Sequence, residues 1–412
     1  MNTSLTSSVT AAGASIGRQS ATILAMEAVL QGRKLSLGKP RLLDADDVVA
    51  VRDQLLRYRD SLVGIYHRSA TQQSDSPSRI IAILDRASTY KARTGFADRV
   101  AMLPLRERLG HIIERGHKLY LVLPMGGGKV PNPLKTGDSY LPDSSEWIAL
   151  SMLSAIAEVI GEFHQPGASV VIIPDTPLHT GDLAFPEPEG FLHRRMLQRD
   201  LGALGLADHV HVVETTRYLP DEWPAEVERL GRNARVRMAA DPEFAADVRA
   251  QVGALIYGQN IRSSFWSYEH SVLVNAALAG FSAHLPDDVL RDASDVYRQT
   301  ERVGPHYVGV NHALRTLDIP GRVVHELSGE RDYIRLTVHA KSGEPRPLLT
   351  QNSKRARPGL LPMHSVALQF HTGEGPRVAN IFEVEARVFG YRPVVESAND
   401  RLLFFEELET SS

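Results

Sequence analysis

The sequence predicts an α/β protein built on a Rossmann-like parallel sheet with flanking helices. Three short apolar runs indicate the strands: KLYLVLP at 118–124, SVVII at 169–173 and HVHVVE at 209–214. Strands that are buried on both faces of a parallel sheet have continuous apolar sequences of this kind. Between the first two runs, residues 145–163 carry apolar side chains at helical spacing, as a crossover helix does. We therefore assign 117–304 to a Rossmann-like α/β domain.

The N-terminal part of the chain is predicted to be helical. Residues 1–21 are small and polar, which is typical of a flexible arm. From Val48 to Ile65, apolar residues recur at steps of three and four, and Asp44 is placed to cap that helix. We expect a helical N-terminal region over 22–116 and assign it packing rather than chemistry.

The C-terminal part, 305–412, is predicted to be a smaller β-rich region. Short strands are expected at 333–339, 365–371, 378–384 and 386–389. The Pro- and Arg-rich segment 343–362 between them is expected to be a long loop.

The composition of the 412-residue chain excludes several classes of protein. Lys and Arg number 46 against 49 Asp and Glu, so no basic field indicates a nucleic-acid or membrane partner. The absence of Cys excludes a disulfide scaffold, Cys-ligated zinc, an iron–sulfur cluster and a cysteine nucleophile. No apolar stretch reaches the ~18–20 residues of a membrane span, and the N-terminus lacks the pattern of a signal peptide. We expect a soluble cytoplasmic protein.

The densest group of polar residues lies at 124–147, between the first two predicted strands. This loop and the residues after Ile173 leave the sheet at the edge where open parallel sheets bind ligands. The polar side chains expected to converge there are Lys129, Asn132, Lys135, Asp143, Glu146 and Asp175. Together with the amides of Gly127 and Gly128, the two lysines suit a phosphate or carboxylate. A surface loop with solvated lysines explains the residue types equally well.

Two known phosphate-binding motifs are excluded at this loop. The lysine of GGGK is followed by Val130 and Pro131 rather than by Ser or Thr, so the loop is not a Walker P-loop. The dinucleotide fingerprint GxGxxG is absent as well.

The remaining candidates are an arginine and several histidines. Arg335, Thr337 and His339 alternate on one face of a predicted strand, where a half-buried face turned to solvent is the equal alternative. His364 follows Pro362. The pair His209 and His211 is better interpreted as packed or exposed than as a metal site. His179 and Asp182 depart by one residue from the His-x-Asp pattern of iron oxygenases.

The order of these motifs resembles the isonitrile (isocyanide) synthases related to the pyoverdine/dityrosine biosynthesis proteins. PMGGGKVPNPLK at 124–135 is similar to a loop ending Lys-Ser-x-Asn-x-x-Lys, and Pro142, Asp143 and Glu146 match a Pro-Asp-x-x-Glu step into a helix. Further matches follow in the family's order: PGA at 166–168, PDT at 174–176, FLHRRMLQRDL at 191–201, IRLTVH at 334–339 and LPMHS at 361–365. The resemblance spans roughly 117–370. It departs from the family pattern at the GGG of the first loop, at Thr176 and at Met363.

The resemblance implies an enzyme that condenses the α-amine of tyrosine or tryptophan with the ketone of ribulose 5-phosphate. Carbon–carbon cleavage and phosphate loss then leave an isonitrile, and no metal or organic cofactor is implied. The implied partners are the two small-molecule substrates, and an iron/2-oxoglutarate oxygenase or a cytochrome P450 that processes the product.

The candidate residues fit this chemistry. The implied catalytic residues are Lys129, Glu146, Asp175, His339 and His364. The implied substrate-binding residues are Gly127, Gly128, Asn132, Lys135, Asp143 and Arg335. Among them, the lysines are expected to hold phosphate, Arg335 the amino acid's carboxylate, and the carboxyl and imidazole groups to move protons. A Schiff base on a lysine is the alternative to phosphate binding.

Three other functions are compatible with the sequence. A diverged member of the family would act on a different amine or sugar phosphate, and a non-catalytic relative would only bind. An iron oxygenase is favoured by the scattered histidines alone.

Overall fold

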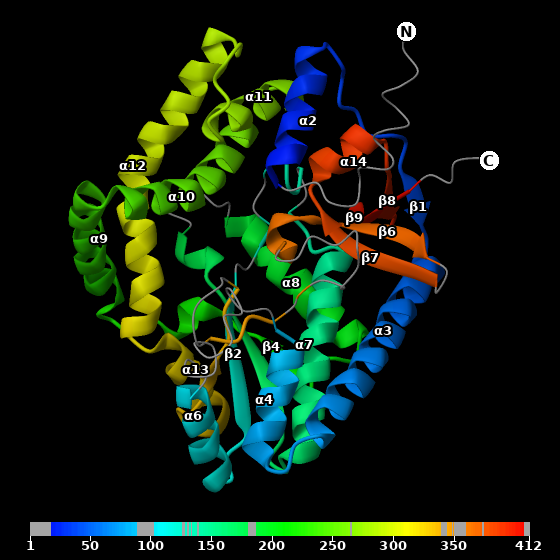
Figure 1. Ribbon diagram of the computed structural model, residues 1–412, viewed down its shortest axis with the longest axis vertical. Coiled ribbons are helices and arrows are strands. Elements are labelled where there is room, and N and C mark those ends of the chain that lie inside the picture. The colour runs from blue at the N-terminus through cyan, green and yellow to red at the C-terminus, as the bar shows by residue number, and fades with distance from the viewer. Residues whose placement is uncertain are drawn as a thin grey trace.

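The computed structural model describes residues 18–88, 103–125, 128–129, 132, 134–137, 140–179, 187–263, 266–338, 344–347, 349, 360–372 and 375–407. It confirms the mixed α/β class. A four-stranded parallel sheet and a five-stranded mixed sheet are surrounded by helices (Figure 1). No helix within the described ranges is long and apolar enough to cross a membrane.

The parallel sheet has the strand order β4-β3-β2-β5. Its strands are β2 (Leu119–Met125), β3 (Ala168–Pro174), β4 (Val210–Val212) and β5 (Ile334–Arg335). Leu121 and its alternate neighbours pack against α7 (Ser144–Phe163), whereas Val122 belongs to a second cluster with α13 (Ile319–Ser328). Burial on both faces explains why the three predicted strands are continuous apolar runs.

The order of these strands creates a topological switch between β2 and β5. From β2 the chain steps through α7 to β3 and then to β4 on one side. Much later it returns to the other side of β2, where Ile334 pairs with Leu121. The segment 333–339, predicted as part of the C-terminal β-rich region, therefore contributes its two strand residues to the central sheet. Open α/β sheets bind ligands at the carboxyl ends of the strands beside such a switch.

The N-terminal region consists of α2 (Arg18–Leu30), α3 (Ala45–Thr71), α4 (Ser76–Arg86) and α6 (Leu103–Glu114). Helices α3 and α4 pack against α7, the central helix of the fold, whereas α2 packs in a separate cluster with Val272 and Phe382. The predicted cap of α3 is confirmed, since the Asp44 carboxylate accepts a hydrogen bond of 3.0 Å from the Asp47 amide. Leu55 and Tyr66 from α3 join the same buried cluster as Trp147 of α7.

A layer of long helices covers the other side of the molecule, at the left in Figure 1. It contains α9 (Trp223–Ala240), α10 (Pro242–Ser263), α11 (Tyr268–Leu278) and α12 (Asp287–Thr316). The backbones of α9 and α12 touch: a Cβ atom at Gly309 would lie 2.5 Å from the Val227 carbonyl oxygen. Helix α12 also contains Pro305, which has no amide proton for the helical ladder.

The mixed sheet lies at the N-terminal end of α7 and has the order β1-β8-β9-β6-β7. Its strands are β1 (Arg41–Leu43), β6 (Val366–Thr372), β7 (Gly375–Ile381), β8 (Arg392–Glu396) and β9 (Arg401–Glu406). The predicted strand at 386–389 is wrong: these residues end α14 (Glu383–Phe389). The Glu385 carboxylate accepts from the Phe382 amide at 2.8 Å, which starts a helix, and Gly390 ends it at φ 71°.

A fully buried arginine, Arg401, forms ion pairs that connect the mixed sheet to a helix. Arg401 of β9 donates to Asp200 of α8 (Glu187–Ala203) at 2.7 Å and to Glu396 of β8 at 2.9 Å. The indole of Trp147 donates to the same Asp200 oxygen at 2.7 Å. Each charge is therefore matched by a partner, as buried ions require.

Candidate functional site

The N-terminus of α7 carries two of the predicted site residues in a capping box. The Asp143 carboxylate accepts from the Ser145 amide at 2.7 Å, and the Glu146 carboxylate accepts from the Asp143 amide at 2.8 Å. The Pro-Asp-x-x-Glu step is thus the signal that starts this helix. Because both carboxyl groups are buried, the cap also places negative charge inside the protein.

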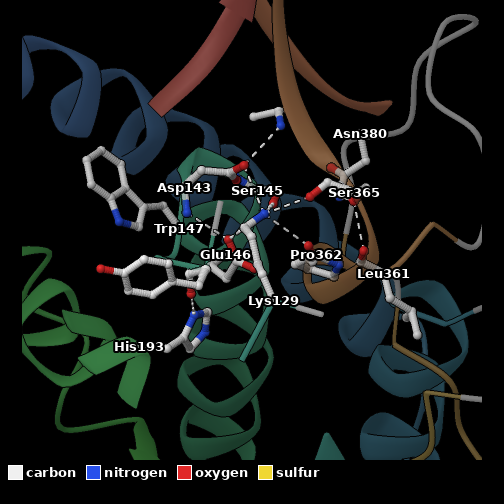
Figure 2. Close-up of polar contacts among 12 residues, drawn as sticks. Lys129, Asp143, Ser145, Glu146, Trp147, His193, Leu361, Pro362, Ser365 and Asn380 are labelled. Carbon is white, nitrogen blue, oxygen red and sulfur yellow. Dashed lines mark hydrogen bonds and ion pairs between the residues drawn. The ribbon is translucent and has the colours of Figure 1, made fainter. Parts of the chain in front are cut away.

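Lys129 lies against this cap with its ammonium group enclosed by acceptors (Figure 2). Its Nζ is 2.9 Å from Asp143 Oδ2 and 3.4 Å from Glu146 Oε2. It also donates to the backbone carbonyls of Pro362 at 3.2 Å and Ser365 at 2.7 Å. The side chain is 0% exposed. Lys129 therefore joins the loop after β2 to α7 and to the short helix η3 (Pro362–His364), and its catalytic role stays a prediction.

Burial and charge shift the proton affinities of this group. Burial would lower the pKa of Lys129, but Asp143 and Glu146 outweigh it and raise that pKa above its usual value. Burial raises the pKa of Glu146 to about 8, against the opposing effect of the Lys129 ammonium. Glu146 Oε1 has no hydrogen-bond partner within the described part of the chain. Glu146 therefore has a free oxygen and a pKa suited to proton transfer near neutral pH.

Asn132 and Lys135 form the turn that follows this loop. The Asn132 side-chain oxygen accepts a hydrogen bond from the Leu134 amide at 3.0 Å. The backbone carbonyl of Asn132 accepts one from the Lys135 amide at 2.8 Å. A Cβ atom at Gly137 would overlap the Glu383 carboxylate, so the turn rests directly on α14. Gly128 is buried in the same loop. Gly127 and His339 lie outside the described residues.

His364 lies in η3, between the two carbonyls that accept from Lys129. It is half-buried, and its amide donates to the Leu361 carbonyl at 2.9 Å. The chain thus brings His364 into the turn that contacts the Lys129 group, although more than 200 residues separate them in sequence. Met363, one of the departures from the family pattern, is buried in this turn.

Asp175 follows β3 at the carboxyl edge of the sheet, as predicted. The side chain is half-buried and has no ion-pair partner among the residues that the structure describes. Burial raises the pKa of Asp175 to about 6. The hydroxyl of Thr215 donates to the Pro174 carbonyl and so fixes the strand end that presents Asp175.

Arg335 of β5 faces a second arginine across one carboxylate. Its Nε lies 3.6 Å from Glu344 Oε2, while Arg315 Nη2 of α12 lies 3.9 Å from Glu344 Oε1. Burial lowers the pKa of Arg335, and the neighbouring Arg315 charge lowers it further. Two guanidinium groups around one loosely held carboxylate form a place where a carboxylate or phosphate can bind. Sequence reasoning missed Arg315 because it sits in a long helix with no local motif.

His179 and Tyr307 also lie at this edge. The sequence places His179 near the ligand edge with only a weak iron-oxygenase pattern, and it gives no indication of Tyr307. Their rings lie 4.9 Å apart next to the end of β3. No signal in the sequence connects them, because α12 follows β3 by more than 100 residues.

The other histidine pair lies away from this edge. His209 directly precedes β4 and His211 is within it, on the edge strand of the sheet, and His209 Nε2 is 4.0 Å from Glu158 Oε2. Among the described residues, no three His, Asp or Glu side chains are grouped so that they could hold a metal ion.

Comparisons with known proteins support the family resemblance. Residues 109–237 match the family described as pyoverdine/dityrosine biosynthesis protein. Isocyanide synthase A of Aspergillus fumigatus is 34% identical over 142 residues, which are 33% of this chain and 23% of that protein. L-tyrosine isonitrile synthase of Pseudomonas aeruginosa is 38% identical over 68 residues, 16% of this chain and 20% of that protein. The chain thus matches about a fifth of the length of each curated relative.

A solved structure shares the fold over most of the chain. The crystal structure of the PvcA protein of Pseudomonas aeruginosa aligns with a TM-score of 0.58 at 18% identity, covering 81% of this chain and 100% of that one. The segment matched by the family contains Lys129, Glu146 and Asp175 and ends before Arg335 and His364.

Proposed function

We propose that this protein, whose residues 109–237 match the pyoverdine/dityrosine biosynthesis family, is an isonitrile synthase. It joins the α-amine of an aromatic amino acid, tyrosine or tryptophan, to ribulose 5-phosphate and leaves an isonitrile carbon on the amine nitrogen. Both curated relatives are named as isocyanide or isonitrile synthases, which supports the reaction class.

One observation carries the proposal: candidate proton-transfer groups and cations lie on β5 and directly after β2 and β3, which are neighbours in the parallel sheet. Glu146 has a pKa of about 8 and Asp175 a pKa of about 6, so both exchange protons near neutral pH. Arg335 and Arg315 supply positive charge beside β2, at the topological switch. Condensing an amino acid with a sugar phosphate requires groups that transfer protons and cations that bind the carboxylate or the phosphate.

Each group has a defined task in the proposed reaction. The paired arginines bind one of the two substrate anions, either the carboxylate of the amino acid or the phosphate of the sugar, in place of Glu344. Attack of the amine on the ketone releases water, and Glu146 moves the protons that this condensation requires. Asp175 serves as the base that removes a carbon-bound proton of the sugar, a step on the way to phosphate loss and carbon–carbon cleavage.

The protein acts on small molecules in the cytoplasm, with no nucleic-acid or membrane partner and no metal or organic cofactor. An iron/2-oxoglutarate oxygenase or a cytochrome P450 consumes the isonitrile.

The direct test is incubation of the purified protein with ribulose 5-phosphate and a panel of amino acids. Infrared absorption of the isonitrile group and the product mass are recorded. An isonitrile formed from tyrosine or tryptophan supports the full proposal, whereas one formed from another amino acid supports the reaction and corrects the substrate. No product across the panel, from folded protein, overturns the proposed activity.

Two variants test whether the reaction uses this edge. Glu146→Gln keeps the shape of the side chain and is expected to lower kcat by about 10²–10⁴-fold. Arg335→Ala is expected to lower kcat/KM by about 10–100-fold, chiefly through KM, because a charge-assisted hydrogen bond is lost. Arg229→Ala is the matched control, since Arg229 pairs with a carboxylate on the exposed surface of α9. Equal activity of all three variants would place the site elsewhere.

A further inference from the structure

His179 is a buried histidine whose hydrogen-bonding capacity is unused. It ends the short helix η1 (Thr176–His179) that follows β3, and it is 6% exposed. Neither ring nitrogen has a hydrogen-bond partner among the described residues. Buried polar side chains in proteins are nearly always satisfied, so an unsatisfied imidazole at a ligand-binding edge indicates a missing partner.

The position of His179 is fixed from two sides. Its ring lies 4.9 Å from the ring of Tyr307 with an interplanar angle of 30°. The Leu178 amide donates to the Asp175 carbonyl at 2.9 Å, which closes the turn that carries both Asp175 and His179. Leu178 itself packs into a cluster that contains Val310 of α12. The imidazole is therefore preorganised rather than free to turn toward solvent.

Helix α12 is packed closely against α9 where it meets this turn. Pro305 and Gly309 flank Tyr307, and both positions touch α9: a Cβ at Gly231 would lie 3.2 Å from the Pro305 carbonyl oxygen. The Asp175 charge reaches the same tyrosine, since burial and then Asp175 raise the pKa of Tyr307 to about 12. His179 thus contacts Tyr307, and the turn at the end of β3 holds Asp175 four residues before it.

The imidazole is neutral at physiological pH. Burial and, to a smaller extent, the nearby His306 lower the pKa of His179 to about 3. A neutral imidazole presents one N–H donor and one acceptor, which suits a carbonyl or hydroxyl oxygen. A carboxylate base beside a neutral imidazole donor is the arrangement that enzymes use to form enolates from carbonyl compounds.

We infer that His179 is a catalytic residue that donates a hydrogen bond to the carbonyl oxygen of a ketose while Asp175 removes a proton from the neighbouring carbon. The C–H electron pair becomes the new C=C bond, and the π pair of the carbonyl moves to the oxygen that His179 holds. The proton passes to the Asp175 carboxylate, so the step needs no oxidant or reductant. Tyr307 is the positioning residue. The inference rests on the proposed function for its ketose, ribulose 5-phosphate.

The test separates enolate formation from isonitrile formation. Ribulose 5-phosphate is incubated with the protein in D₂O, with and without the accepted amino acid, and loss of carbon-bound protons is followed by NMR. Binding of the sugar phosphate is measured by calorimetry, and isonitrile by infrared absorption. The variants are His179→Phe, which keeps the stacked ring without nitrogen, and His179→Gln, which keeps a donor.

A third variant controls for the loss of any buried histidine. His164 is 5% exposed and its Nε2 lies 2.7 Å from the His117 carbonyl oxygen, at the opposite end of the sheet. His164→Phe is expected to exchange deuterium at the wild-type rate per folded molecule. His179→Phe is expected to lower exchange by about 10²–10³-fold, the cost of losing one donor to a developing oxyanion, with binding within a few-fold. His179→Gln is expected to recover part of that rate.

The outcomes distinguish this inference from the proposed function. Isonitrile formation with wild-type exchange in His179→Phe overturns the role of His179 and leaves the proposed function standing. Exchange that depends on His179 without any isonitrile supports the enolate site and overturns the proposed function. Isonitrile formed without exchange in the wild-type protein overturns the inference, and absence of both activities overturns both.

Discussion

Two groups of buried polar residues lie at the carboxyl edge of the parallel sheet, and they are satisfied in opposite ways. After β2, the Lys129 ammonium has two carboxylates and two backbone carbonyls around it. After β3, His179 is almost as deeply buried and has no hydrogen-bond partner among the described residues. The first arrangement pairs the buried ammonium with acceptors of the protein itself, whereas the second leaves bonding capacity for a ligand. Burial alone therefore does not identify a reactive side chain.

The largest expected effect comes from breaking the compensated group. Lys129→Met removes the cation and leaves the carboxyl groups of Asp143 and Glu146 buried beside each other. We expect a loss of about 3–5 kcal/mol in the free energy of unfolding, as for removal of one partner of a buried ion pair. Urea denaturation measures it. Lys39→Met, at an exposed lysine, is the control and should change stability by less than about 0.5 kcal/mol. Equal losses of stability in Lys129→Met and Lys39→Met would mean that the Lys129 side chain is solvated.

The cluster formed by Lys129 and its acceptors was only partly predictable from sequence. The apolar runs predicted β2, β3 and β4, and helical spacing predicted α7, because local periodicity reports burial directly. The acceptors of Lys129 include the carbonyls of Pro362 and Ser365, which lie more than 230 residues away. No local pattern shows that a lysine in a Gly-rich loop points inward.

Errors arose where one short pattern fits two structures. Residues 386–389 are consistent with both a strand and the last turn of a helix, and the cap at Glu385 decides for the helix. The strand at 333–339 was recognised from its β-type residues, but its partner β2 is set by topology. The pair of His179 and Tyr307 could not be found from sequence, because β3 and α12 meet only in the folded chain.

The next largest effect is expected at His164, a buried histidine that has a hydrogen-bond partner where His179 has none among the described residues. His164→Phe removes the group that meets the His117 carbonyl oxygen at 2.7 Å and leaves that oxygen without this contact. We expect a loss of about 1–3 kcal/mol in the free energy of unfolding, the cost of an unsatisfied buried polar group. Thermal and urea denaturation measure it. A loss no larger than that of Lys39→Met would show that this hydrogen bond contributes nothing.

His179→Phe should behave differently in the same measurement. The substitution removes two nitrogen atoms that lack partners among the described residues and keeps the ring that stacks on Tyr307. Stability is expected to be unchanged or to rise by about 1 kcal/mol, because no hydrogen bond is lost and a buried polar group disappears. A loss as large as that of His164→Phe would mean that the imidazole has a structural partner.

The smallest expected effect is a pH dependence that comes from Asp175. Its pKa is about 6 in the folded protein and lower when unfolded, so the ionised form opposes folding. The contribution of Asp175 to stability is therefore full below its unfolded pKa and is lost as pH rises to about 6. Asp175→Asn does not ionise, so its melting temperature should exceed that of the wild-type protein increasingly from pH 4.5 to 6.5. The difference should then stay constant up to pH 8, at a value equivalent to about 1 kcal/mol in the free energy of unfolding, because the side chain is only half-buried. A difference that does not vary with pH would show that Asp175 keeps an ordinary pKa, and the base of the enolate step would then be sought elsewhere at this edge.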